Sequence, residues 1–282
     1  MSEPGAVGAV GGVGAVGGVG GVGGVLRVAL VQRAASLDPA ENRRALDDLS
    51  SRVEPGTDLV VLPEAFMRDF GSPGSDISAF AEPLDGPFVQ RLTALARERG
   101  CVVVAGMFEV SDDATRPFNT LAVVDGDGLR ASYRKIHLYD SFGYRESDRL
   151  VAGDVAPVTV TVAGTTVGLM TCYDLRFPEL ARELVRRGAR LLVAPSAWVA
   201  GPAKVDHWLT LVRARAIENV VYVAAVGQPG PRYTGHTLLV GPAGEVVAQL
   251  GDGEHVLTGR VEGEVLERAR HDNPSLLNTR FG

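Results

Sequence analysis

Three residues with reactive side chains, Glu64, Lys135 and Cys172, each stand at the end of an expected strand. A cysteine can act as a nucleophile, a glutamate can transfer protons, and a lysine can stabilise developing negative charge. Ligands of α/β proteins bind at the carboxyl ends of strands, where residues far apart in the sequence can meet. We therefore expect the three side chains to converge on one catalytic site.

Each of these residues also has an ordinary structural explanation. Glu64 follows an apolar run and a proline and should be partly desolvated, but acidic residues are common in loops after strands. Lys135 stands where a hairpin ends, and most lysines lie on the surface. Cys172 lies in a tight connection before a helix that has Pro178 in its first turn. That geometry lowers a thiol pKa and supplies backbone N–H donors, although a buried structural cysteine fits equally well.

Other candidate sites have weaker support in the sequence. The five histidines show no metal-ligand spacing, so we expect no metal site, although a pair of Cys172 with His137 or His236 stays open. Cys101 begins an apolar strand and is assigned to core packing. Residues 12–17 match the spacing G-x-G-x-x-G, but they lack the preceding strand and following helix that a dinucleotide site requires.

The elements that must position these side chains alternate between strands and helices. Strands are expected at 25–31, 58–62, 101–107, 118–124, 129–134, 158–162, 165–170, 190–194 and 220–226, with three short ones near residues 237, 246 and 257. Helices are expected at about 38–53, 87–99, 177–187 and 206–219. Hairpins at 118–134 and 158–170 are too frequent for a purely parallel sheet, so the pattern predicts a layered α/β fold.

Composition indicates a globular protein with one large domain. The chain has 282 residues, of which 45% are hydrophobic and 22% charged. Residues 1–24 end in a tract of Gly, Ala and Val and are expected to be a disordered tail, with the domain at 25–282. A net charge of -6 argues against nucleic-acid or membrane partners and favours a small molecule. Two cysteines make no disulfide framework, and this fits a cytoplasmic protein.

Three segments of the chain resemble the signatures of the nitrilase superfamily of carbon-nitrogen hydrolases. They are residues 62–66 (LPEAF), 133–138 (YRKIHL) and 172–179 (CYDLRFPE), and they occur in the family's order. The resemblance extends over nearly the whole chain after the tail and implies that the three reactive residues are catalytic. It also implies a four-layer α-β-β-α sandwich that forms homodimers or higher homo-oligomers and uses no metal or organic cofactor.

The same resemblance implies a second glutamate and a covalent mechanism. Glu146 stands where the family has that glutamate, although a solvated loop carboxylate would otherwise be its ordinary explanation. In the implied reaction, Glu64 takes the proton of Cys172 and the thiolate attacks an amide carbon. Lys135 and the backbone N–H of Tyr173 hold the oxyanion. Ammonia leaves, and water activated by Glu64 hydrolyses the resulting thioester.

The segment after Cys172 indicates which substrates to expect. True nitrilases generally carry a tryptophan directly after the cysteine, whereas Tyr173 resembles the amidase-like Nit branch, which includes ω-amidases and deaminated glutathione amidases. Arg176 resembles that branch's clamp for a substrate carboxylate, and a guanidinium can bind a carboxylate through two parallel hydrogen bonds. We therefore expect an enzyme that hydrolyses small linear carboxylate-bearing amides. Residues 139–144 depart from the Nit pattern, so the rim of the pocket should differ.

Three alternatives share the same catalytic residues or the same fold. An N-carbamoyl amide hydrolase would release carbon dioxide as well as ammonia, and a nitrilase would accept nitriles. A non-catalytic binding module would have an unreactive thiol at Cys172, but such a module has no need for a glutamate, a lysine and a cysteine at neighbouring strand ends.

Overall fold

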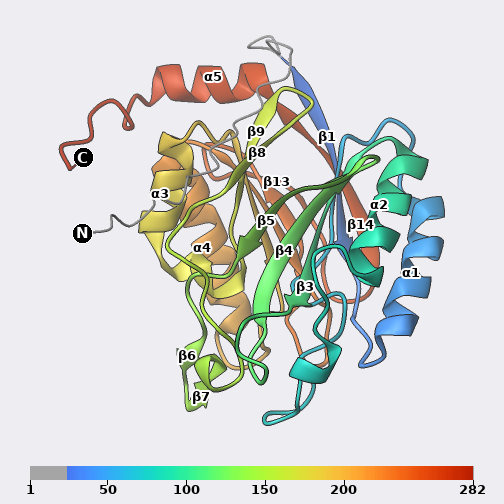
Figure 1. Cartoon of the computed structure of the whole chain (residues 1–282). Helices are drawn as coiled ribbons and strands as arrows, with labels where there is room; N and C mark the ends of the chain where they lie inside the picture. Colours follow the sequence, from blue (N-terminus) through green and yellow to red (C-terminus); the bar gives the residue numbers. More distant parts are fainter. Residues whose placement is uncertain (1–23, 282) are drawn as a thin grey trace, which may run out of the picture.

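A computed structural model describes residues 24–281, which fold around two six-stranded sheets (Figure 1). The first sheet has the order β14-β1-β2-β3-β4-β5, and the second has the order β13-β12-β11-β10-β9-β8. The strands of the first sheet are β1 (Val25–Gln32), β2 (Leu59–Val61), β3 (Val102–Glu109), β4 (Phe118–Asp125), β5 (Gly128–Arg134) and β14 (His255–Glu262). Those of the second are β8 (Thr159–Val162), β9 (Thr165–Leu169), β10 (Leu191–Ser196), β11 (Tyr222–Gly227), β12 (Leu238–Val240) and β13 (Val246–Gln249).

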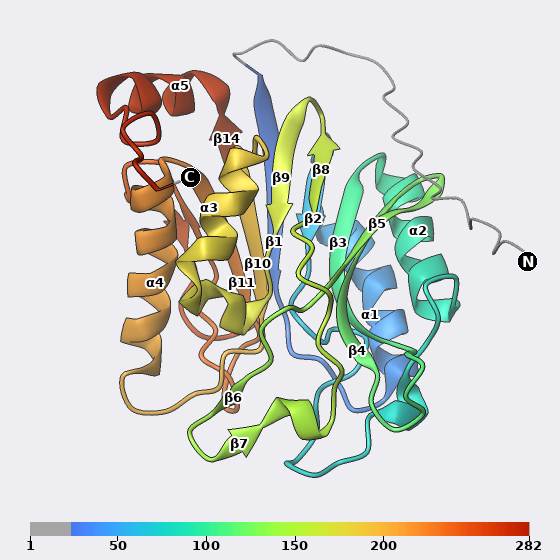
Figure 2. The same ribbon diagram turned by 60° about the vertical axis from the view of Figure 1, so that its left-hand side comes forward.

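The two sheets lie face to face between two pairs of helices, as Figure 2 shows. Helices α1 (Pro39–Arg52) and α2 (Pro87–Arg99) cover the first sheet. Helices α3 (Pro178–Arg186) and α4 (Lys204–Asn219) cover the second. The expected four-layer α-β-β-α sandwich is therefore confirmed, and α5 (Gly263–Asp272) extends beyond one end of it.

Alternation along the strands divides the apolar core into two parts. On β1, Leu26, Val28 and Leu30 belong to the cluster that fills the space between the sheets, whereas Ala29 and Val31 pack with α1 and α2. Successive side chains of a strand point to opposite faces, so a strand covered on both faces must be apolar throughout. This explains why the strands at the centre of each sheet lack the polar residues that usually mark a solvent-facing side.

The centre of each sheet is parallel, and this brings several strand ends together. Strands β1, β2 and β3 run parallel in the first sheet, and β9, β10 and β11 run parallel in the second. Antiparallel hairpins β4–β5 and β8–β9 extend them, as the sequence predicts. The loops that follow β2, β5, β9 and β10 meet at one end of the sandwich, where their residues contact one another.

The structure departs from the sequence prediction at one strand, one helix and one small hairpin. The expected short strand near residue 257 is β14, an eight-residue strand that pairs antiparallel with β1 along its whole length. Helix α5 and the small hairpin β6 (Asp140–Ser141) and β7 (Tyr144–Arg145) were not predicted. Each strand of this hairpin has two residues, which is too short for a hydrophobic period to show. The expected disordered tail, apart from Gly24, and the G-x-G-x-x-G segment lie outside the described residues. No helix in residues 24–281 is long and apolar enough to cross a membrane.

Candidate active site

Glu64 occupies the loop after β2, and its backbone lies directly against β3. A Cβ on Gly106 of β3 would lie 2.4 Å from the backbone nitrogen of Ala65 and 2.7 Å from the Cα of Glu64. Only glycine allows two backbones to approach this closely. The N–H of Gly106 donates to the carbonyl of Pro63 (3.1 Å), and Gln228 Nε2 donates to the carbonyl of Glu64 (2.9 Å). The backbone of Glu64 is thus fixed from both sheets.

The carboxylate of Glu64 is buried and accepts hydrogen bonds from three sides. Oε1 accepts from Lys135 Nζ (2.9 Å) and from Asn119 Nδ2 of β4 (2.8 Å). Oε2 accepts from the backbone N–H of Ala197, which follows β10 (2.7 Å). Such bonds satisfy the buried carboxylate and fix its orientation. The carboxylate is therefore held in one orientation, in which it can accept a proton from a neighbouring donor.

Lys135 lies fully buried between two carboxylates. Besides its bond to Glu64, Nζ donates to Glu146 Oε2 (2.9 Å) and Oε1 (3.2 Å). Glu146 comes from a 3-10 turn, Glu146–Asp148, and its Oε2 also accepts from the backbone N–H of Tyr139 (2.6 Å). Burial alone would lower the pKa of Lys135, but the charges of Glu146 and Glu64 outweigh it, so the pKa is raised well above its usual value. Lys135 is thus a permanent cation in the site.

Cys172 begins the 3-10 turn Cys172–Arg176 that connects β9 to α3. Its φ of 45° lies in the left-handed region, which costs a non-glycine residue free energy and is found most often at functional sites. Burial, followed by the charge of Glu64, raises the pKa of the thiol well above its usual value, although Lys135 opposes the shift. The expectation of a lowered pKa at this turn is therefore wrong, because desolvation outweighs the nearby donors. The resting thiol is neutral and needs a base to become a nucleophile.

Asp174 joins the Cys172 turn to the segment that carries Lys135. Its Oδ2 accepts from Tyr133 Oη (2.6 Å) and from the backbone N–H of Thr171 (2.8 Å). Its Oδ1 accepts from the backbone N–H of His137 (3.2 Å) and lies 2.7 Å from the ring Nδ1 of that histidine. Tyr133 and His137 flank Lys135 two residues on either side. One fully buried carboxylate therefore sets the position of the lysine relative to the cysteine.

Replacing Asp174 by asparagine is expected to lower both stability and kcat. The amide has the same volume but presents an NH2 group to donors, and losing hydrogen bonds to a buried charge costs about 1.5–3 kcal/mol each. A misplacement near 1 Å can reduce catalysis about 100-fold, so kcat should fall more than KM changes. Thermal melts and steady-state kinetics would measure both effects, with Tyr133→Phe as the milder variant that removes one donor. An unchanged kcat in a destabilised Asp174→Asn protein would mean that Asp174 supports the fold alone.

The two residues expected to bind substrate lie beside this cluster. Tyr173 follows Cys172 directly and is half-buried. The guanidinium of Arg176 lies over the ring of Trp198, 5.1 Å from its centroid. Nε and Nη2 of Arg176 are buried and have no hydrogen-bond partner among the residues that the structure describes. Arg176 is therefore a half-buried cation with two unpartnered donors that could bind an anion.

The structure gives no support to the alternative sites considered from the sequence. His137 Nδ1 is engaged with Asp174, and His236 Nδ1 faces the carbonyl of Thr234. In the described part of the chain, neither ring forms a hydrogen bond with Cys172. Among residues 24–281, no group of three or more His, Cys, Asp or Glu side chains has an arrangement that could hold a metal ion.

Comparison with curated proteins shows relatives along most of the chain. The profile of the family described as carbon-nitrogen hydrolase matches residues 27–271. A hydrolase of Mycobacterium tuberculosis is 40% identical, over 87% of this chain and 92% of the relative. The deaminated glutathione amidase of Escherichia coli O157:H7 is 36% identical, over 83% and 88%. The omega-amidase NIT2 of Homo sapiens is 35% identical, over 88% and 92%.

Solved structures have the same fold. A CN-hydrolase superfamily protein of Xanthomonas campestris superimposes with a TM-score of 0.83 at 30% identity, covering 92% of this chain and 98% of that chain. A mutant of the amidase from Nesterenkonia sp. AN1, with an acetamide moiety added covalently at its active-site cysteine, gives a TM-score of 0.76 at 29% identity, covering 90% and 94%. This chain therefore belongs to the carbon-nitrogen hydrolase family, in the amidase-like branch of the nitrilase superfamily, and is an enzyme that hydrolyses carbon-nitrogen bonds.

Proposed function

We propose that this enzyme hydrolyses small linear amides that carry a carboxylate, through a thioester on Cys172, and releases ammonia and a carboxylic acid. The observation that carries the proposal is the buried cluster beside Cys172, in which Lys135 is held between Glu64 and Glu146. A neutral thiol, an oriented carboxylate and a permanent cation are the groups that acyl transfer through a cysteine requires.

In the first half of the reaction, Glu64 accepts the thiol proton while the sulfur attacks the amide carbon. The carbonyl π electrons move to oxygen, and Lys135 Nζ and the backbone N–H of Tyr173 donate to the oxyanion. Each such donor lowers the barrier by about 3–4 kcal/mol. The carbon-nitrogen bond then breaks, and Glu64 returns its proton to the departing nitrogen, so that ammonia leaves and a thioester remains.

In the second half, Glu64 accepts a proton from a water molecule that attacks the thioester carbon. The tetrahedral intermediate collapses, the carbon-sulfur bond breaks, and the proton returns to the sulfur of Cys172. Glu146 holds Lys135 in place throughout. Of the three bonds made by Nζ, the 3.2 Å bond to Glu146 Oε1 is the longest and is the one that a substrate oxygen would replace.

The relatives support this mechanism and substrate class. The Nesterenkonia amidase forms a covalent adduct at its active-site cysteine, and two curated relatives carry the names deaminated glutathione amidase and omega-amidase. In this chain, the unpartnered Nε and Nη2 of Arg176 are suited to a substrate carboxylate, and the Trp198 ring beneath the guanidinium holds its plane. Tyr173 lies between this cation and the nucleophile in sequence.

An assay of ammonia release tests the proposal and the role of Arg176 together. Substrates would be ω-amides, N-carbamoyl amino acids and nitriles, with succinamate and butyramide as a matched pair with and without a carboxylate. Arg176→Ala is expected to lower kcat/KM for succinamate about 100-fold and to leave butyramide nearly unaffected, because only succinamate loses an ion pair. Arg176→Lys keeps the charge but not the planar fork, so its kcat/KM for succinamate should lie between those of wild type and Arg176→Ala.

Other results of this assay would assign the enzyme to a different reaction class. Carbon dioxide released together with ammonia from a carbamoyl substrate would favour the N-carbamoyl amide hydrolase, and turnover of nitriles alone would favour the nitrilase. Equal losses on succinamate and butyramide in Arg176→Ala would remove the carboxylate clamp from the proposal.

The proposed enzyme acts in the cytoplasm as a homodimer or higher homo-oligomer and binds neither nucleic acid nor membrane. Both cysteines are free, as expected of a protein from a reducing compartment. The proposed scheme needs no cofactor, because the substrate, water and the four side chains supply every proton and electron pair.

A further inference from the structure

Lysine is nearly absent from this chain. Of its 28 lysine and arginine residues, only Lys135 and Lys204 are lysines. Arginine and lysine are equally suited to solvated surfaces, but they differ where a compact point charge or a planar fork is needed. One of the two lysines lies at the centre of the catalytic cluster, which raises the question of what the other one does.

Lys204 is a half-buried cation held by aromatic side chains. It is the first residue of α4, and its Nζ donates to Tyr139 Oη (3.2 Å). The ammonium lies 4.2 Å from the ring centroid of Phe142 and 5.4 Å from that of Tyr139. Within residues 24–281, no carboxylate lies in ion-pair range of it. Its charge is therefore uncompensated by any anion of the described chain.

Two short chains of contacts connect Lys204 to the active site. On one side, the ring of Tyr139 meets the ring of Tyr173 edge-on at 5.0 Å, and the backbone N–H of Tyr139 donates to Glu146. On the other side, the carbonyl of Lys204 accepts from Trp198 Nε1 (3.0 Å), and the ring of Trp198 lies under Arg176. A single residue, Tyr139, thus connects Lys204 to Tyr173, which follows the nucleophile. A single residue, Trp198, connects Lys204 to Arg176, the proposed carboxylate clamp.

The Lys204 ammonium and the Tyr139 hydroxyl form a pair of adjacent donors. Tyr139 Oη accepts from Lys204, and its own O–H donates to no residue in the part of the chain that the structure describes. A cation next to a free hydroxyl donor matches the two oxygens of a carboxylate, and a partly desolvated cation binds an anion more strongly than a fully solvated one. Tyr139 and Phe142 belong to residues 139–144, the segment that departs from the Nit pattern.

We propose that Lys204 and Tyr139 bind a second, distal carboxylate of the substrate, so that the preferred amides are dicarboxylates. This inference rests on the proposed function, in which Arg176 holds the carboxylate nearer to the scissile amide. Both cations belong to residues that contact Trp198, and together they would select a substrate with two negative groups over one with a single negative group. Lys204 would act in binding alone, since it contacts none of the reacting groups.

Paired glutamine derivatives provide the test. N-malonylglutamine and N-succinylglutamine carry a distal carboxylate, whereas N-propionylglutamine and N-butyrylglutamine have the same acyl lengths without it. For at least one of the two acyl lengths, we expect the wild-type enzyme to have a kcat/KM about tenfold higher for the charged substrate than for its neutral counterpart, mainly because KM is lower. Lys204→Met should reduce this ratio to about one, and Lys204→Arg should keep part of it.

The ratio between paired substrates separates binding from support of the fold. A merely structural Lys204 would lower activity on both members equally and leave the ratio unchanged in Lys204→Met, which would overturn the inference. Equal wild-type turnover of charged and neutral members would also overturn it while leaving the proposed function intact. Failure of the wild-type enzyme on every amide, succinamate included, would instead overturn the proposed function and this inference with it.

Discussion

Replacing Cys172 by alanine is expected to abolish ammonia release, with kcat lower by at least about 10⁴-fold. Without the sulfur no thioester can form, and Glu64 and Lys135 would have to direct water at the amide itself. The substitution removes one small side chain with 8% exposure, so the protein should remain folded and still bind substrate. Steady-state kinetics, with binding of succinamate measured by calorimetry, would separate the loss of chemistry from the loss of binding.

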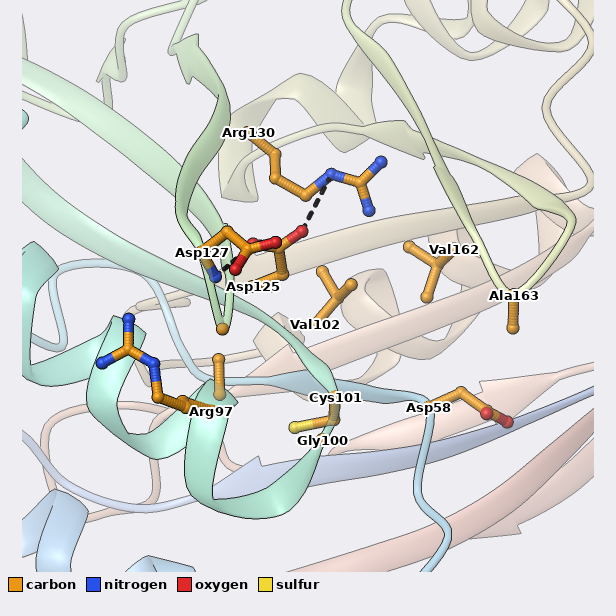
Figure 3. Close-up of a pocket in the computed structure, with 12 residues that line it drawn as sticks. Asp58, Arg97, Gly100, Cys101, Val102, Asp125, Asp127, Arg130, Val162 and Ala163 are labelled. Atoms are coloured by element: carbon orange, nitrogen blue, oxygen red, sulfur yellow. Dashed lines mark hydrogen bonds and ion pairs between the residues drawn. The ribbon is translucent and has the colours of Figure 1, made fainter. Parts of the chain in front are cut away.

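The second cysteine provides a matched control. Cys101 directly precedes β3, at the opposite end of the sheets from Cys172, and lines the shallow pocket shown in Figure 3 together with Asp58 and Arg130. Burial raises the pKa of its thiol to about 11, so it is a poor nucleophile at neutral pH. Cys101→Ala should keep full activity. Iodoacetamide should label Cys172 alone, because only Cys172 has a neighbouring base, Glu64, that can accept its thiol proton.

Trapping the intermediate gives an independent check. Quenching the wild-type reaction with acid should leave a fraction of the chain heavier by the acyl group, and hydroxylamine should release that group as a hydroxamate. Substantial turnover by Cys172→Ala, above about 1% of wild type, would show that water attacks the amide directly and would exclude the covalent mechanism.

The position of the three reactive residues could be predicted because strand ends are readable from the sequence. Glu64 and Cys172 follow apolar strands of the parallel centre of each sheet, and Lys135 follows the second strand of a hairpin that ends at the same edge of the molecule. Glu146 could be assigned only by resemblance, because it lies in a 3-10 turn after a two-residue strand, where no hydrophobic period exists. Arg176 was placed by resemblance as well, and its unpartnered nitrogens became visible only in the structure.

The residues that hold the catalytic groups differ in how far they could have been foreseen. Asn119 had a signal, because the register of the predicted hairpin sets Thr120 opposite Arg134 and so brings Asn119 to Lys135. No feature of the sequence predicts the roles of Ala197 and Asp174. Ala197 acts through its backbone N–H across the space between the sheets, and Asp174 meets Tyr133 only when β5 and the Cys172 turn pack together. Such contacts depend on tertiary packing, which local sequence does not encode.

A single lysine lies between the two buried carboxylates of the active site. Glu64 and Glu146 are buried carboxylates that share the Lys135 ammonium. Burial raises the pKa of Glu146, and the charge of Glu64 adds to this, while Lys135 lowers it. A buried pair that loses one partner leaves a charge uncompensated, which typically costs about 3–5 kcal/mol. Lys135 should therefore matter to both stability and catalysis, and the two effects can be separated.

Replacing Lys135 by methionine is expected to lower kcat at least about 10³-fold and to destabilise the protein by about 3–5 kcal/mol at neutral pH. Without the lysine, the pKa of Glu146 in the folded state rises further above its unfolded value. A carboxyl with a raised folded pKa favours the folded state at low pH and loses that contribution as pH rises. The Tm deficit of Lys135→Met relative to wild type should therefore be larger at pH 8 than at pH 5.

The double variant Lys135→Met/Glu146→Gln distinguishes the two roles of the lysine. It removes one of the two carboxylates that are left without their cation, so it should recover much of the lost Tm and flatten its dependence on pH. Activity should not return, because the oxyanion still lacks its cationic donor. Recovery of activity together with stability would mean that Lys135 serves the enzyme only by neutralising Glu146. A Tm deficit that grows toward low pH would contradict the assigned charge states.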